Sequence, residues 1–293
     1  MPAAHPLRGA LLCVAALALF ACMDTVTKYL AQSHAVPLIV GVRYLGNLAL
    51  MVAFLGPTHG QQMIRTQRTG LVWIRAGCLA SASLLIGLAL QRMPVAETTA
   101  ITFLAPILLV AVAGPMLGER VGWVGWAATL AGFAGVLLIA RPGSGLVTSG
   151  VLFVLGAVLL NLGYQALSRV LAASENTFAL LFYTALAGSI LYGLAMPWFI
   201  EDRAPSLFEA GLFASLGMFG GLGHFLFTAA FRYAPASLIA PLNYLQLLWA
   251  GLLGYLVFGH VPDAVSLLGM AVIAGSGVLM ALKTRRPPVK RTA

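Results

Sequence analysis

The sequence lacks most of the charge that a soluble protein carries. Only 9% of its 293 residues are Asp, Glu, Lys or Arg, whereas 60% are hydrophobic. Soluble domains have about 25% charged and about 45–50% apolar residues. Because a spanning helix needs about 20 apolar residues, ten such helices would use about 200 residues and leave only short connectors. The composition therefore predicts an all-α polytopic membrane protein and excludes a separate soluble catalytic domain.

Cysteine and acidic residues are also scarce. The three cysteines, Cys13, Cys22 and Cys78, lie in apolar runs with no CxxC pair and no histidine cluster, so neither a disulfide framework nor a zinc site is expected. Eight acidic residues against 17 basic ones give a net charge of +9. The basic residues collect in short loops and in the C-terminal tail, not in a stripe with exposed aromatics. We therefore expect contact with the lipid bilayer and no nucleic-acid binding.

Catalytic signatures are missing as well. The sequence contains no GxSxG, no HExxH and no nucleotide-binding loop, and no connector is long enough for an ATPase domain. The glycine-rich run 217–223 lacks the Lys-Ser/Thr ending of a phosphate loop, and close helix packing explains it better. We expect no enzyme activity, no cofactor and no metal site.

Ten apolar segments account for most of the chain, and helices suit them because unpaired backbone cannot face lipid. The first begins after Arg8 and resembles a signal sequence, but it continues past Cys22, so we expect a retained helix. The connectors contain the turn formers Gly56-Pro57, Arg92-Met93-Pro94, Arg141-Pro142-Gly143 and Arg203-Ala204-Pro205. The predicted helices are Leu11–Leu30, Pro37–Leu55, Leu71–Leu90, Val95–Leu117, Trp123–Ala140, Val147–Leu171, Phe178–Phe199, Leu207–Phe231, Ser237–Phe258 and Ala264–Leu282.

The distribution of Lys and Arg predicts the orientation. With the N-terminus inside, twelve of the 17 basic residues fall on the inner side, among them Arg75 and the five of the tail, and five fall outside. Cytoplasmic loops carry the excess of basic residues. Both termini are therefore expected in the cytoplasm.

An internal repeat divides the chain into two units. The run 91–96 (QRMPVA) matches 232–237 (RYAPAS) at an offset of about 141, and 117–119 (LGE) matches 258–260 (FGH) at the same offset. We predict a first five-helix unit over 7–141, a second over 147–283 and a basic tail over 284–293. An odd number of helices per unit inserts the second copy upside down. Inverted repeats place a substrate site at their interface near the bilayer midplane.

Several runs resemble the EamA-type proteins of the drug/metabolite transporter superfamily. They are Asp24–Lys28 (DTVTK) in the first helix, Arg43-Tyr44 in the second, and Leu117–Arg120 (LGER) before a glycine-rich fifth helix. The resemblance covers nearly the whole chain and implies ten helices in two inverted units. The second half departs from it at Gly259-His260, where many members have Gly-Glu.

The resemblance implies a secondary transporter that works by alternating access in the bacterial inner membrane. The chain is most similar to exporters of metabolites and amino acids, which implies export of amino acids, including aromatic or apolar ones. One alternative is a carrier of a nucleoside-bearing cation such as S-adenosylmethionine. Another is a membrane sensor or scaffold that does not transport. A bundle with its own cavity needs no partner chain, so a monomer is expected.

Charged residues within the predicted spans are candidates for gating or ion pairing, because a charge at mid-bilayer costs about 2.5–3.5 kcal/mol. Asp24 and Lys28 are one helical turn apart and can form a structural ion pair, or they can face a cavity together with Arg43. Arg43 can instead cap a helix or extend to the headgroups. Glu97 lies so near the start of its helix that depth alone can keep it in water.

The fourth helix has a polar face and two prolines. Thr98, Thr102 and Pro106 share this face, which suits either helix packing or a substrate path. Pro106, Pro115 and, in the ninth helix, Pro241 are predicted to break their helices, because proline removes a backbone donor.

Two polar stripes are the predicted substrate site. Their amide and phenol groups can bind amino and carboxylate functions, and Trp249 can form an apolar subsite; hydrogen bonds between helices explain the stripes equally well. His224 can couple protons or can be a structural hydrogen-bonded residue. The stripes consist of Asn161, Tyr164 and Gln165 in the sixth helix, and of Asn243, Tyr244 and Trp249 in the ninth.

Overall fold

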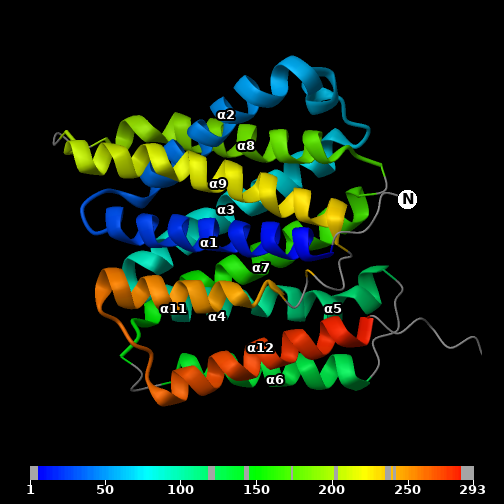
Figure 1. Cartoon of the computed structure of the whole chain (residues 1–293), viewed down its shortest axis with the longest axis vertical. Helices are drawn as coiled ribbons and strands as arrows, with labels where there is room; N and C mark the ends of the chain where they lie inside the picture. Colours follow the sequence, from blue (N-terminus) through cyan, green and yellow to red (C-terminus); the bar gives the residue numbers. More distant parts are fainter. Residues whose placement is uncertain are drawn as a thin grey trace, which may run out of the picture.

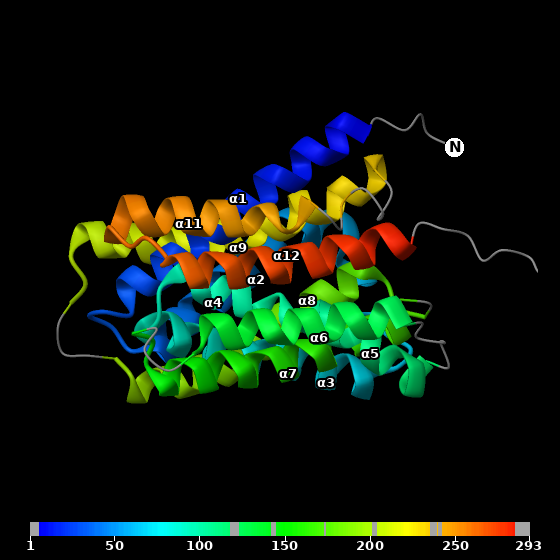
Figure 2. The ribbon, with the colours of Figure 1, turned by 90° about the horizontal axis from the view of Figure 1, so that it is seen from below.

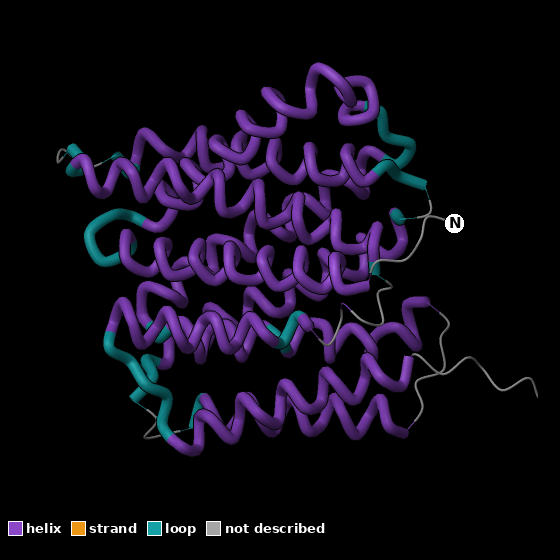
Figure 3. The backbone as a smooth tube through the Cα atoms, viewed as in Figure 1, coloured by secondary structure: helices purple, strands orange, loops and turns teal. Residues whose placement is uncertain are grey.

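The secondary structure in the described part of the chain is all helix, joined by turns and short connectors. The computed structural model describes residues 6–117, 123–141, 145–172, 174–200, 204–234, 239 and 242–284, and these residues contain no strand (Figure 3). The elements are α1 Pro6–Leu30, α2 Val36–Ile64, α3 Thr69–Arg92, α4 Val95–Thr102, α5 Leu104–Leu117, α6 Trp123–Ile139, α7 Thr148–Leu171, α8 Thr177–Ala195, the 3-10 turn η1 Met196–Trp198, α9 Leu207–Tyr233, α11 Leu245–Phe258 and α12 Ala264–Thr284.

Helix is present in each of the ten predicted apolar segments. In the described chain, six helices are long and apolar enough to cross a membrane, and shorter apolar helices occupy the other segments. Large apolar side chains cover outward faces, for example Leu130 at 68% exposed and Leu159 at 64%. Such faces suit lipid, in which only internally hydrogen-bonded backbone is stable. The all-α membrane class is thus supported.

The helices lie side by side in one bundle (Figure 1). The strongest packing joins α1 to α9, α3 to α7, α2 to α8 and α6 to α12. Every one of these pairs combines a helix from the first half of the chain with one from the second. In Figure 2, α9, α11 and α12 lie in the upper part of the bundle, and α3, α6 and α7 lie in the lower part.

The two ends of the bundle contain different connections. The start of α1 and the end of α12 lie at the same end, at the right of Figure 1, which we call the terminal end. The opposite end, which we call the distal end, contains the end of α1, the connection from α3 to α4 and the connection from α11 to α12. The predicted basic tail over 284–293 lies beyond the described residues except for Thr284.

Small residues allow the central helices to approach closely. A Cβ added at Gly217 of α9 would lie 2.9 Å from the backbone of Gly46 in α2, and a Cβ at Gly188 of α8 would overlap the ring of Tyr44. Tyr44 also stacks on Tyr192, with ring centroids 6.0 Å apart. Glycine at such positions is typical of membrane helix interfaces.

The second helix is longer than predicted. The sequence indicated a connector at Gly56-Pro57, but α2 continues through Pro57 to Ile64. A proline removes one donor and disturbs the carbonyl one turn earlier. Met63, in the turn after this proline, is buried at 2% exposed, so packing maintains the helix through this position.

The fourth predicted helix is interrupted. α4 ends at Thr102 and α5 begins at Leu104. Pro106 lies four residues after Thr102, so its ring and missing N–H act on the carbonyl where α4 ends. No break occurs at Pro115, because the backbone stays helical from there to Leu117; the adjacent turns accommodate the single lost donor. Pro241 lies outside the described residues.

Candidate functional site

A buried arginine connects three helices near the terminal end. Arg75 of α3 is 4% exposed. Its Nε donates to Ser168 Oγ at 2.7 Å, and its Nη2 donates to the Tyr164 hydroxyl at 2.9 Å. Its Nη1 donates to Leu180 O and to Thr184 Oγ1, both at 3.0 Å. We call these five residues the Arg75 cluster.

The Arg75 cluster contains a charge and no carboxylate. All the described hydrogen-bond acceptors of Arg75 are neutral oxygens, and the guanidinium also lies 4.4 Å from the centroid of the Tyr164 ring. A buried charge needs compensation, so the cluster is suited to an anionic group. From the sequence, Arg75 was counted among the basic residues of the inner side and was not singled out as a site residue. An arginine inside a span is itself a functional signal that could have identified it.

A second charged group lies on the distal side of the middle. Asp24 is six residues from the end of α1, which is about 9 Å along the helix, and the charge of Arg43 acts on it. The Arg43 guanidinium lies 5.1 Å from the centroid of the Tyr44 ring, and its Nη1 is 3.8 Å from Met23 Sδ. Asp24 and Arg43 thus place opposite charges on neighbouring helices within the bundle.

The structure does not form the predicted ion pair between Asp24 and Lys28. The Lys28 ammonium donates to Leu90 O at 2.9 Å and to Met93 O at 2.7 Å. These carbonyls end α3, where a cation is favoured by unpaired oxygens and by the helix dipole. One turn of spacing permits the pair, but the Lys28 ammonium is bound by the end of α3 instead.

His224 of α9 is close enough to two arginines for their charges to act on it. Its ring packs on Phe20, with centroids 4.9 Å apart, and the charges of both Arg43 and Arg75 act on it. We call Asp24, Arg43, His224 and Arg75 the polar column, because the charge of Arg43 acts on Asp24 and the charges of Arg43 and Arg75 both act on His224.

One residue of the predicted polar stripe on α7 bonds to α3. Tyr164 hydrogen-bonds to Arg75, whereas Gln165 Nε2 is 3.4 Å from Asn161 Oδ1 within the same helix. Hydroxyls on α4 are also bonded locally: Thr98 donates to Pro94 O, and Thr102 donates to Thr98 O and Thr99 O. These threonines therefore bond to their own helix in this structure.

The other predicted stripe lies at the start of α11. Asn243 Oδ1 is 3.8 Å from Cys13 Sγ, and the Tyr244 ring lies 4.8 Å from that of Phe103. A Cβ at Gly277 of α12 would overlap the Tyr244 hydroxyl. Trp249 packs against the apolar cluster formed by α1 and α9. Tyr164 and Tyr244 thus belong to two different clusters.

Glu97 is buried, in contrast to the expectation of a water-exposed position. It is 2% exposed, and its Oε1 is 2.8 Å from His260 Nε2. Surrounding helices cover the start of α4, so depth along the helix does not decide its exposure. The sequence singled out His260 as a departure from the family pattern but did not indicate this partner.

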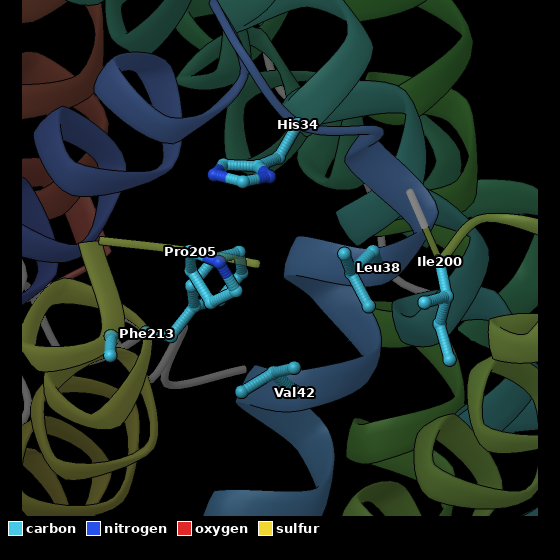
Figure 4. Close-up of a pocket in the computed structure, with 7 residues that line it drawn as sticks. His34, Leu38, Val42, Ile200, Pro205 and Phe213 are labelled. Carbon is cyan, nitrogen blue, oxygen red and sulfur yellow. The ribbon is translucent and has the colours of Figure 1, made fainter. Parts of the chain in front are cut away.

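An apolar pocket opens at the distal end (Figure 4). Its volume is about 330 Å³, and it lies between the start of α2 and the connection from η1 to α9. None of the predicted site residues lines it. Its lining is apolar apart from one histidine and consists of His34, Leu38, Val42, Ile200, Pro205, Ala210 and Phe213.

Comparison with known proteins identifies relatives over most of the chain. The chain is 25% identical over 252 residues to the S-adenosylmethionine uptake transporter of Rickettsia bellii, covering 85% of each protein. It is 26% identical to the riboflavin transporter of Vibrio cholerae, covering 92% of this chain and 91% of that one. It is 25% identical to the pseudopaline exporter CntI of Pseudomonas aeruginosa, covering 90% and 93%.

A solved crystal structure has the same fold, with a TM-score of 0.64 at 20% identity and coverage of 94% of this chain and 99% of that one. The EamA-like transporter family matches residues 7–141 and again residues 148–282. The family expected from the sequence is confirmed, and the relatives are named as transporters and not as enzymes. The chain is therefore a membrane transporter that belongs to the EamA-like transporter family.

Proposed function

We propose that the protein is a secondary transporter of a small zwitterionic metabolite built on an amino-acid head group. The polar column is the observation that carries this proposal. It offers one carboxylate, Asp24, and two guanidinium groups, Arg43 and Arg75, inside a bundle that is otherwise mostly apolar.

The chemistry of the polar column matches such a head group. A substrate carboxylate can accept two parallel hydrogen bonds from a guanidinium, and a substrate ammonium can pair with Asp24. Tyr44 and Tyr164 place aromatic rings beside the arginines, and such rings suit the apolar part of a substrate. A substrate that supplies both charges also satisfies the requirement that buried charges be paired.

One of the relatives is named for a substrate of this class, and another is not. S-adenosylmethionine, named for the Rickettsia protein, carries the same amino-acid head group as the amino acids expected from the sequence. Riboflavin, named for the Vibrio protein, lacks that head group. The head group therefore distinguishes the proposed substrates from riboflavin.

The proposed mechanism is alternating access between two inverted halves in a bacterial inner membrane, with the terminal end in the cytoplasm. The packing supports it. α1 packs on α9 and α3 packs on α7, and a two-fold axis that exchanges the halves would relate the first pair to the second. Phe103 and Tyr244 are separated by the repeat offset of 141 and pack on each other, as equivalent residues do at such an axis. Rocking of the halves would open each end in turn.

Counterflow in proteoliposomes tests the proposal. Purified protein is reconstituted into vesicles loaded with unlabelled methionine, and uptake of labelled methionine, phenylalanine, threonine and S-adenosylmethionine is measured. We expect saturable uptake that free amino acids compete and that their α-amides do not. Asp24→Asn and Arg43→Gln should abolish it, whereas Glu175→Gln, a change in the loop before α8, should not.

Two outcomes would contradict the proposal. Competition by methionine amide equal to that by methionine would show that the carboxylate is not bound, and competition by riboflavin alone would assign another substrate class. Direction is measured with right-side-out and inside-out vesicles, since the sequence predicts export whereas the Rickettsia relative is named for uptake.

A further inference from the structure

We propose that Glu97 and His260 form a proton-binding latch that closes the distal end of the transport pathway. The inference rests on the proposed alternating access but not on the identity of the substrate. It goes beyond the polar column, because neither residue belongs to it.

The latch joins the two halves of the molecule. Glu97 lies in the first turn of α4, and His260 lies in the connection from α11 to α12, 163 positions later. Their contact, 2.8 Å between Oε1 and Nε2, crosses from one half to the other. The Glu97 side chain is 3% exposed and the His260 side chain is 36% exposed. One partner is thus shielded, while the other can exchange a proton with water.

Glu97 depends on His260 for its hydrogen bonding. Its other oxygen, Oε2, is buried and has no hydrogen-bond partner among the described residues. The charge of Glu97 acts on Lys28, but the Lys28 ammonium donates to the carbonyls at the end of α3. A buried carboxylate with one bonded oxygen is costly when its partner is neutral and is stabilised when the partner is a cation.

The other charged groups around α4 have partners of their own. On α3, Arg92 bonds to Leu88 O and Gln91 and lies over the Phe153 ring. Asp263, which precedes α12, pairs with Arg141 after α6 at 2.9 Å. The remaining titratable groups on α1 and α11 near this end are Asp24, Tyr29 and Tyr255. The described parts of α5, α6, α7 and α12 contribute no charged side chain at the distal end.

The local backbone directs His260 to this position. Gly259 ends α11 with φ +65, a left-handed conformation that favours glycine. A Glu at position 260 would place a second carboxylate beside Glu97. His260 instead supplies an imidazole, which is a cation only when it is protonated. The proton balance is simple: imidazole takes one proton from water to become the cation that binds the carboxylate, and returns it to water when the latch opens.

Thiol labelling tests the latch without any substrate. Thr98, next to Glu97 and 1% exposed, is replaced by Cys in full-length protein in which Cys13, Cys22 and Cys78 are Ala. A membrane-impermeant thiol reagent is added on the distal side. Leu207→Cys, at the same end and 92% exposed in the wild type, corrects for the effect of pH on thiol reactivity. We expect the corrected labelling rate to rise about tenfold from mildly acidic to mildly alkaline pH, as the imidazolium is lost.

Substitutions identify the responsible group. With His260→Gln added, the Cys introduced at Thr98 should label rapidly at both pH values, because a neutral amide replaces the cation. His59→Gln changes a half-buried histidine at the terminal end, and it should leave the labelling as in the protein without it. A flat pH profile in wild type, or an unchanged profile in His260→Gln, would overturn the latch. Intact pH-dependent labelling without amino-acid counterflow would instead contradict only the proposed substrate.

Discussion

The two ends of the bundle are held together by different chemistry. Near the terminal end, the permanent charge of Arg75 binds neutral oxygens on α7 and α8. At the distal end, Glu97 and His260 hold two halves together through groups that can gain or lose a proton. An arginine keeps its charge at every physiological pH. One end therefore contains a pH-independent clamp, and the other contains the proposed latch.

Removing Arg75 should have the largest effect. Arg75→Gln loses hydrogen bonds to three side chains and one carbonyl, and each bond to a charged group contributes about 1.5–3 kcal/mol. We expect a loss of stability on the order of 3 kcal/mol and counterflow at least about 100-fold lower, since each 1.4 kcal/mol is tenfold. The measurements are thermal unfolding in detergent and initial uptake rate.

Arg75→Lys is the matched control for Arg75→Gln. It keeps the charge but cannot bond four acceptors from a fixed fork, so it should fall between wild type and Arg75→Gln. Transport by Arg75→Gln at the wild-type rate would show that the clamp is not needed.

A change in the middle of the bundle should have the next largest effect. Gly217→Ala places a Cβ 2.9 Å from the backbone of Gly46, which cannot yield as a flexible side chain would. Overpacking of this kind costs about 1–3 kcal/mol, and thermal unfolding measures it. Gly211→Ala on the same helix is the control, because nothing lies within 4 Å of its added Cβ. Equal stability of the two variants would contradict the close approach of α2 and α9.

At the distal end, Lys28→Met should have a smaller effect. It removes the cation from Leu90 O and Met93 O, and we expect a loss of about 1–2 kcal/mol, read from the unfolding temperature. Lys28→Arg retains a cation and should lose less. The contrary outcome is that Asp24→Asn loses as much stability as Lys28→Met and that the double variant loses no more. It would show that Asp24 and Lys28 form the predicted ion pair.

Asp263→Asn should have the smallest effect, and it should depend on pH. The backbone N–H of Ser266 and the guanidinium of Arg141 lower the pKa of Asp263 below its ordinary value near 3.8. A carboxylate with a lowered pKa adds stability above the ordinary value, and that stability is lost as the pH falls through the folded-state pKa. The variant should unfold slightly earlier than wild type at neutral pH and together with it in acid. A difference that grew in acid would contradict the contact.

The helices were easier to predict from the sequence than the partners of their side chains. Apolar runs placed helix in all ten segments because burial in lipid depends on local composition. Pro106 predicted the interruption between α4 and α5 to within about one helical turn. The same reasoning overestimated how strongly Pro57 and Pro115 disturb their helices. Packing can maintain a helix through a proline, and the sequence does not show that packing.

The candidate site was predicted only in part. Asp24, Arg43 and His224 were singled out because charged and titratable groups are rare in spans. Arg75 was missed because it lies near a predicted helix end. In the stripes on α7 and at the start of α11, the structure directs Tyr164 to Arg75 and Tyr244 to Phe103. Their role in binding substrate stays a prediction.

Composition and spacing along the chain were enough to establish the membrane-spanning class, the helical segments and the family, because these properties are local. The contacts of Lys28 at the end of α3, the burial of Arg75 and the meeting of Glu97 with His260 emerge only in the folded bundle. A charged group inside a bundle is stabilised by whichever helices surround it. Those neighbours come from distant parts of the chain, 163 positions apart for Glu97 and His260, and no local pattern specifies them.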